Sequence, residues 1–154
     1  MKWRELIWKM SGPIGLVFVI TGCAYIPGVK DVIRKMDDDR TERAKKSIEE
    51  NPRFAELAKV CSVVKTPEGS RLLSKSLSGH GFQIYDYYHV DKQRPEIYQV
   101  VSGELFNEWR ETRRDDFMGH DTYDFEKEHY RITLQLGGLG PNANFAISCI
   151  DSEP

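Results

Sequence analysis

The densest group of side chains that could bind a metal lies in residues 120–129, which read His-Asp-Thr-Tyr-Asp-Phe-Glu-Lys-Glu-His. Imidazole and carboxylate groups are common ligands of zinc and other divalent metals. In an extended chain Asp124, Glu126 and Glu128 point to one face and His129 to the other, so a site would require a bend. The segment also lacks paired cysteines and the His-Glu-x-x-His pattern of zinc proteases. We therefore expect a solvated edge strand without a metal, and a metal-dependent hydrolase is the alternative.

Residues 137–140, Gly-Gly-Leu-Gly, could form a phosphate-binding loop. Such a loop must lead directly into a helix whose N-terminus binds the phosphate. Here Pro141-Asn142 leads into an extended, apolar segment instead. The glycines therefore predict the turn of a β-hairpin.

Nucleophilic catalysis has little support in the sequence. Cys61 could pair with His80 or His89 as in a thiol protease, but it lies on the apolar stripe of a predicted helix. No Gly-x-Ser-x-Gly motif is present. Glu104 and Glu108 could act as a glycosidase pair, although spacing alone does not establish a cleft. We assign no catalytic residue and no cofactor.

Aromatic residues are frequent between positions 85 and 109. Rings on a sheet can bind a sugar, a peptide or a partner protein, because they present a large apolar area at low entropic cost. A sheet also buries rings in its core, which is the simpler interpretation. The residues expected to form a binding face are Tyr85, Tyr87, Tyr98 and Trp109.

The elements that would position these residues begin with two helices. Apolar residues recur every three or four positions over residues 29–50, and a second apolar stripe runs from 52 to about 64. Pro52 separates the two, since proline is tolerated in a first turn but disfavours helical angles in the residue before it. Residues 71–77 add at most one short helical turn.

The pattern then becomes extended. Residues 82–90 predict a strand. Residues 97–109 fit a helix or a strand pairing with 82–90, and we favour the strand because Ser102-Gly103 interrupts a helix. Residues 110–124 are highly charged and predict a loop, and 130–136 with 143–150 predict a hairpin. The expected fold is α+β, with two N-terminal helices packed on one face of a sheet of three to five antiparallel strands.

The N-terminal segment has the order of a secretory signal. Three basic residues and Glu5 precede the apolar residues 14–20, and Ile20, Thr21, Gly22 and Cys23 follow in that order. This segment resembles the lipobox of bacterial lipoprotein precursors. The resemblance implies cleavage before Cys23 and lipidation of that residue. An uncleaved membrane anchor is the alternative, although residues 12–13 and 26–28 bracket a run shorter than the roughly 20 apolar residues of a spanning helix.

The resemblance also sets the expected organisation of the chain. Residues 1–22 would be the signal peptide, 23–28 a tether, and 29–154 a single α+β domain. Removing three basic and one acidic residue leaves 19 basic and 23 acidic side chains, a net charge of −4. This balance argues against nucleic acid as a partner. Cys61 and Cys149 would then be an even pair in an oxidising compartment, which predicts a disulfide.

The resulting functional expectation is a lipid-anchored envelope protein. Ala24 follows the cysteine in place of the aspartate that retains such proteins in the inner membrane, so the resemblance implies the outer membrane, facing the periplasm. We expect a binding or assembly module rather than an enzyme, acting on an envelope protein, peptide or glycan. The alternatives are a small envelope hydrolase using residues 120–129 and an assembly factor with an uncleaved anchor.

Overall fold

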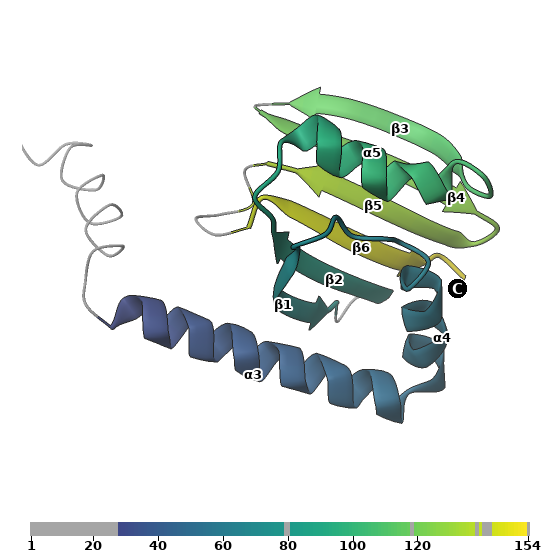
Figure 1. Ribbon diagram of the computed structural model, residues 1–154. Helices are drawn as coiled ribbons and strands as arrows, with labels where there is room; N and C mark the ends of the chain where they lie inside the picture. The colour runs from purple at the N-terminus through teal and green to yellow at the C-terminus, as the bar shows by residue number, and fades with distance from the viewer. Residues whose placement is uncertain (1–27, 79–80, 118, 138, 140–142, 154) are drawn as a thin grey trace, which may run out of the picture. The chain divides into compact units, whose positions relative to one another are not determined.

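The computed structural model describes residues 28–78, 81–117, 119–137, 139 and 143–153 (Figure 1). The predicted signal peptide, Cys23 and His80 lie outside the described residues, as does most of the 137–142 turn. The chain groups into two compact units, residues 1–36 and 37–154. The boundary falls within helix α3 (Val29–Glu50), so its first two turns are treated separately below.

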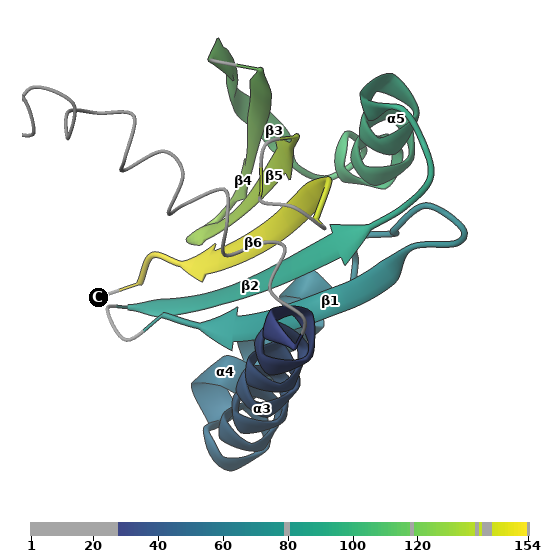
Figure 2. The same cartoon turned by 90° about the vertical axis from the view of Figure 1, so that its left-hand side faces the viewer.

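The second unit is built on a six-stranded antiparallel sheet with the order β1-β2-β6-β5-β4-β3. Figure 2 shows how strongly this sheet twists between β1 at one edge and β3 at the other. The predicted strand at 82–90 and the predicted C-terminal hairpin are confirmed as β2 and as β5 with β6. The strands are β1 (Arg71–Leu77), β2 (Phe82–His89), β3 (Arg110–Phe117), β4 (His120–Lys127), β5 (Tyr130–Leu136) and β6 (Phe145–Asp151).

The two predicted N-terminal helices are confirmed as α3 and α4 (Pro52–Cys61). The side chain of Asn51 caps α4 by accepting a hydrogen bond from the Arg53 amide at 3.0 Å, and Pro52 occupies the first turn. Helix α4 packs against β2 and β6. In α3, the hydroxyl of Thr41 accepts a hydrogen bond from the Lys75 amide at 3.0 Å, which ties the helix to edge strand β1.

A third helix, α5 (Arg94–Leu105), replaces the strand predicted at 97–109. Its first turn contains Pro95, and the Glu96 carboxylate accepts a hydrogen bond from the Gln93 amide at 2.9 Å. Ser102 does not break the helix, because its hydroxyl donates to the carbonyl of Tyr98 one turn earlier at 2.7 Å. Ile97, Val101 and Leu105 lie four residues apart and are each at most 1% exposed, so they form the buried face of α5.

Two further predictions were wrong because pairing with a neighbouring strand, which the local sequence does not show, decides these segments. Residues 71–77 form β1, not a helical turn, and the charged 110–124 segment forms β3 and most of β4 rather than a loop. The sheet therefore has six strands instead of three to five. Strand β4 is also not an edge strand, since it lies between β3 and β5.

One hydrophobic core joins the sheet to α4 and α5. Leu57 of α4, Phe125 of β4 and Phe145 of β6 are fully buried in it. The α+β class is thus confirmed. Within the described part of the chain, no helix has both the length and the apolar character needed to cross a membrane.

Candidate binding face

The strand register defines which side chains share each face of the sheet. Ile84, Cys149, Ile132 and Phe125 lie directly opposite one another across β2, β6, β5 and β4, so they point to the same side. Cys149 contacts α4 through Cys61, and Phe125 contacts Phe106 just after α5, with ring centroids 5.7 Å apart. Helices α4 and α5 therefore cover this face.

The neighbouring residues along each strand point away from α4 and α5. We call this opposite side the Tyr85 face. It contains two rows of paired residues that cross β2, β6, β5 and β4. The first row is Tyr85, Ser148, Thr133 and Asp124, and the second is Tyr87, Ala146, Gln135 and Thr122.

The centre of the Tyr85 face is made of small side chains. Ser148 and Ala146 of β6 are 8% and 3% exposed, because larger side chains flank them on both neighbouring strands. Tyr85 and Tyr87, on β2, are both half-buried. Burial, followed by the proximity of Tyr87, raises the pKa of Tyr85. Like any tyrosine hydroxyl at neutral pH, this group is protonated and can donate a hydrogen bond.

A buried acid lies at the far end of the first row. Asp124 is 8% exposed, and its Oδ1 accepts a hydrogen bond from the Thr133 hydroxyl at 2.6 Å. The face thus combines two aromatic rings with hydroxyl, amide and carboxylate groups. Such a surface can stack on an apolar ring face and hydrogen-bond to polar groups of the same ligand.

The structure does not bring the four predicted binding residues together. Tyr85 and Tyr87 share the Tyr85 face, whereas Tyr98 lies on α5 and packs at a tilt against Tyr123 with ring centroids 4.3 Å apart. Trp109 is 7% exposed within the core. Only the two β2 tyrosines form a common surface.

Tyr98 belongs to a polar cluster that ties α5 to β3. Its hydroxyl donates to Glu111 at 2.9 Å and accepts from Arg114 at 2.7 Å. Arg114 is the main cause of the lowered pKa of Glu111, and burial is the main cause of the raised pKa of Tyr98. The guanidinium of Arg114 also lies 5.3 Å from the Tyr98 ring centroid, within cation–π range. These mutual contacts satisfy the cluster internally.

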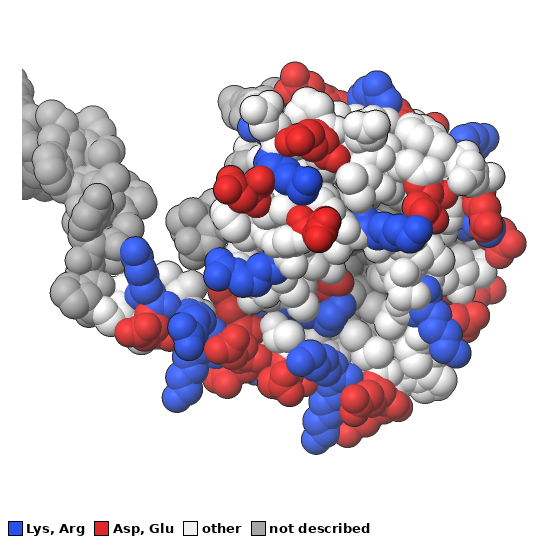
Figure 3. All heavy atoms as spheres, in the orientation of Figure 1, with Lys and Arg blue, Asp and Glu red and all other residues white. Residues whose placement is uncertain are grey.

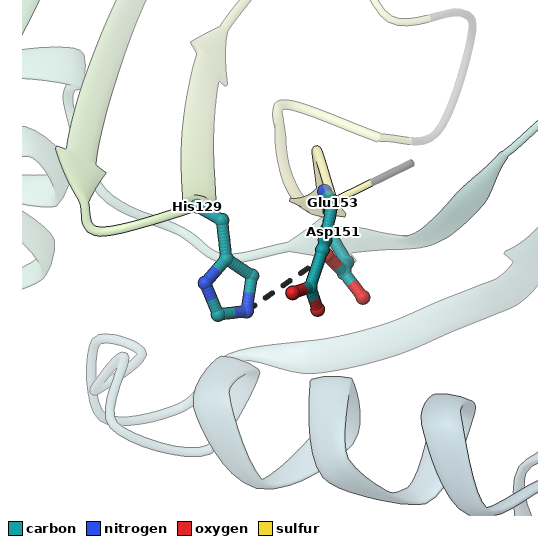
Figure 4. Close-up of side chains that lie close together, drawn as sticks. All are labelled: His129, Asp151 and Glu153. Carbon is teal, nitrogen blue, oxygen red and sulfur yellow. Dashed lines mark hydrogen bonds and ion pairs between the residues drawn. The ribbon is translucent and has the colours of Figure 1, made fainter.

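A group with metal-binding residue types is found at the end of the sheet. Figure 4 shows His129, between β4 and β5, directed toward Asp151 and Glu153 at the C-terminal end of β6. One ligand atom from each of the three lies within 4.8 Å of the others. Asp151 already forms a 2.6 Å ion pair with Arg53, and its Oδ1 accepts from the Glu153 amide at 2.9 Å.

Arg53 fills the role that a cation would have in this group. Its hydrogen bond to Asp151 is the first cause of the lowered pKa of that carboxyl. The negative charge of Asp151 is therefore already balanced by the positive charge of Arg53. Arg53 also donates to the backbone carbonyl of Glu153. These contacts connect α4 to the residues at the end of β6. The group would bind a metal only if Arg53 moved away.

The candidate ligands in residues 120–129 are separated by the strand that they form. The imidazole of His120 lies 2.9 Å from the carbonyl of Gly137, and Glu126 accepts from Arg131 at 3.0 Å. Asp121 lies 3.7 Å from Arg94, and Asp124 is bonded to Thr133. Each of these groups has a protein partner, and they do not converge on one point.

A shallow hollow of about 500 Å³ lies where α5 begins. It is lined by Lys92, Gln93, Arg94, Pro95, Ile97, Gly137 and Asn144. Gly137 has a φ of +82°, and the guanidinium of Arg94 occupies the position of a Cβ atom there, so a side chain at this residue would displace it. The carbonyl and amide of Val90 satisfy the Asn144 side chain. Asn144 and Arg94 of the lining are therefore already paired with other protein groups, Val90 and Asp121.

Comparison with known protein families, curated proteins and solved structures found no match. Function must therefore be inferred from this chain alone.

The predicted cysteine pair lies at disulfide distance. Cys61, the last residue of α4, and Cys149 of β6 have Cα atoms 5.9 Å apart, within the usual range for a bridge. The pair fixes α4 to the central strands, opposite the Tyr85 face. Figure 3 shows acidic and basic side chains intermixed on the side that it presents.

Sequence reasoning missed Ser148, Thr133 and Arg53 as members of these clusters. The alternation in residues 145–151 could have identified Ser148, because Ala146 and Ser148 point to one face of the sheet and Phe145, Ile147 and Cys149 to the other. No local pattern identifies the partnership of Arg53 with Asp151, since 98 residues separate them.

Proposed function

We propose that this chain is a lipid-anchored protein of the bacterial envelope that acts as a non-enzymatic binding or assembly module. The anchor would be Cys23, with residues 1–22 removed, and the domain would face the periplasm from the outer membrane. The Tyr85 face would bind an envelope protein, peptide or glycan.

The anchoring part of the proposal is supported by the lipobox-like Ile20, Thr21, Gly22 and Cys23. The two other cysteines, Cys61 and Cys149, lie at disulfide distance, which suits an oxidising compartment. One feature of the sequence and one of the structure therefore favour export.

The binding part rests on one observation. The Tyr85 face lies on the opposite side of the sheet from α4 and α5, and it presents Tyr85 and Tyr87 beside a polar row. Rings beside hydrogen-bonding groups can stack on a ligand and hydrogen-bond to it at the same time, and this supports the proposal.

The anchoring is tested by the intact mass of the protein extracted from membranes, compared with Cys23→Ala. We expect loss of residues 1–22 and added acyl mass in the wild type only. A full-length mass without acyl chains in the membrane fraction would favour the uncleaved-anchor alternative. A soluble cytoplasmic product would refute the anchoring altogether.

The binding face is tested by co-sedimentation with purified peptidoglycan and by site-specific photo-crosslinking in intact cells. The probe is placed at Tyr85 or Tyr87, with Val63, which is 46% exposed and lies just after α4, as the matched control position. We expect a probe at Tyr85 or Tyr87 to crosslink to a partner and a probe at Val63 not to crosslink. Retention by peptidoglycan should likewise depend on the two β2 positions and not on the control position. Equal signals at all three positions would refute a specific role for this face.

A further inference from the structure

The first two turns of helix α3 carry an exposed apolar stripe. Seven large apolar side chains are exposed among the described residues, and three of them, Val32, Ile33 and Met36, are adjacent on this helix. They are 59%, 45% and 57% exposed. With Val29 they follow the spacing i, i+3, i+4, i+7 and therefore form one face of two helical turns.

This stripe is not a continuation of the surface by which α3 contacts the sheet. That contact uses Thr41, Ala44 and Ile48 in the second half of the helix. At about 100° per residue, their common direction is rotated by roughly 100° from that of the stripe. The stripe therefore lies on a different side of α3 and can contact a partner there.

The charges around the stripe identify the chemistry of that partner. Lys30, Arg34 and Lys35 against Asp31 give residues 29–36 a net charge of +2. Lys30 and Lys35 flank the stripe on its two sides, at about 100° per residue. An apolar face with basic residues beside it is typical of helices that lie in the surface of an anionic membrane.

Acidic residues further along the helix limit the length of the contact. Residues 37–39 are three consecutive aspartates, which an anionic surface repels. The positions that would extend the stripe are Asp39, Arg40 and Arg43, so it ends after two turns. A coiled coil with a second copy requires an apolar seam over several heptads, which this helix lacks.

We infer that the first two turns of α3 lie on the surface of an anionic phospholipid bilayer, with Val32, Ile33 and Met36 inserted among the lipids. This inference rests on the proposed anchoring at Cys23. Five residues lie between Cys23 and Val29, so the start of the helix is at most about 22 Å from the lipid attachment. The anchor and the helix would together orient the domain at the membrane.

The test measures membrane depth along α3 in the full membrane-extracted protein. Ile33→Cys is labelled with an environment-sensitive fluorophore and reconstituted into vesicles of equal parts phosphatidylcholine and phosphatidylglycerol. Asp38→Cys and Glu49→Cys, on the same helix, are the matched controls. Emission and quenching by spin-labelled lipids are recorded for each label.

We expect a blue shift and loss of most emission to lipid quenchers at position 33, with aqueous, unquenched emission at 38 and 49. Lys30→Glu/Lys35→Glu and vesicles of phosphatidylcholine alone should each reduce the quenching at 33. Aqueous emission at 33 in protein whose mass shows acylation would overturn this inference and leave the proposed anchoring intact. A blue shift without lipid quenching, increasing with protein density, would overturn it in favour of a second copy. An unacylated mass refutes the anchoring instead, whatever the labels report.

Discussion

Reduction of the Cys61–Cys149 pair should remove a large share of the domain's stability. The two residues are 88 positions apart in the sequence. In the chain-entropy model, closing a loop of this length lowers the entropy of the unfolded chain by ~15 cal/mol/K, equivalent to ~4.6 kcal/mol at 25 °C. Many bridges contribute about 2–4 kcal/mol, so the expected loss lies between about 2 and 4.6 kcal/mol. Domains of this size are commonly stable by only about 5–15 kcal/mol.

The assay is urea unfolding of the protein with and without reductant, followed by circular dichroism. With a slope of ~2 kcal/mol/M, the unfolding midpoint should fall by about 1–2 M on reduction. Cys61→Ala/Cys149→Ala provides the control, since reductant should not shift its midpoint. Because Cys149 is 1% exposed, the double variant also loses some buried volume, so reduction of the wild type measures the cross-link more directly.

Thiol labelling decides whether the reasoning holds. Both thiols should react in unfolded protein only after reduction. Free thiols before reduction would refute the bridge. An unchanged midpoint after complete reduction would show that the bond forms but does not constrain the unfolded chain as the entropy model requires.

Four other substitutions test the packing and electrostatics of the second unit by the same unfolding measurement. The ion pair with Arg53 lowers the folded-state pKa of Asp151 below its ordinary 3.8, so the pair stabilises the fold above pH 3.8, and this stabilisation is lost as the pH falls through the folded-state pKa. Asp151→Asn should therefore lower stability at neutral pH and flatten the decline of stability toward about pH 2. An acid unfolding profile like that of the wild type would contradict this. Leu57→Ala, at a residue that is 0% exposed, should cost about 2–5 kcal/mol. Gly137→Ala should cost about 1–2 kcal/mol because its φ is +82°, whereas Gly103→Ala, within α5 and with no atom near its Cβ position, should leave stability unchanged or raise it by up to about 1 kcal/mol.

The sequence indicates the start of α5, but the Ser102-Gly103 pair led to the wrong prediction of a strand. Ser102-Gly103 suggested a break, but both residues fit a helix, since Ser102 bonds to the preceding turn and Gly103 has open space around it. Pro95 and the Glu96 contact to Gln93 mark a helix start that residue type alone could have indicated. Position-specific helix capping was thus more informative than the average propensity of the segment.

Strand β3 could not be recognised by apolar alternation. Of its eight residues only Phe117 is apolar, and those described from 112 to 116 are exposed. An edge strand pairs on one side only, and charged residues on it discourage association with other chains. Its pairing with β4 is set by backbone hydrogen bonds and by the apolar residues of β4, such as Phe125, so the information lies in the partner strand.

The candidate ligands of residues 120–129 show why proximity in sequence is a poor guide to a site in a sheet. Strand geometry directs neighbouring residues to opposite faces. His120, Asp121 and Asp124 therefore have separate partners, in the turn after β5, on α5 and on β5 respectively. His129 instead approaches Asp151, which pairs with Tyr130 across β5 and β6. The groupings that matter in this fold are therefore rows across strands, and the same rule brings the two β2 tyrosines together with Ser148 and Ala146 of β6.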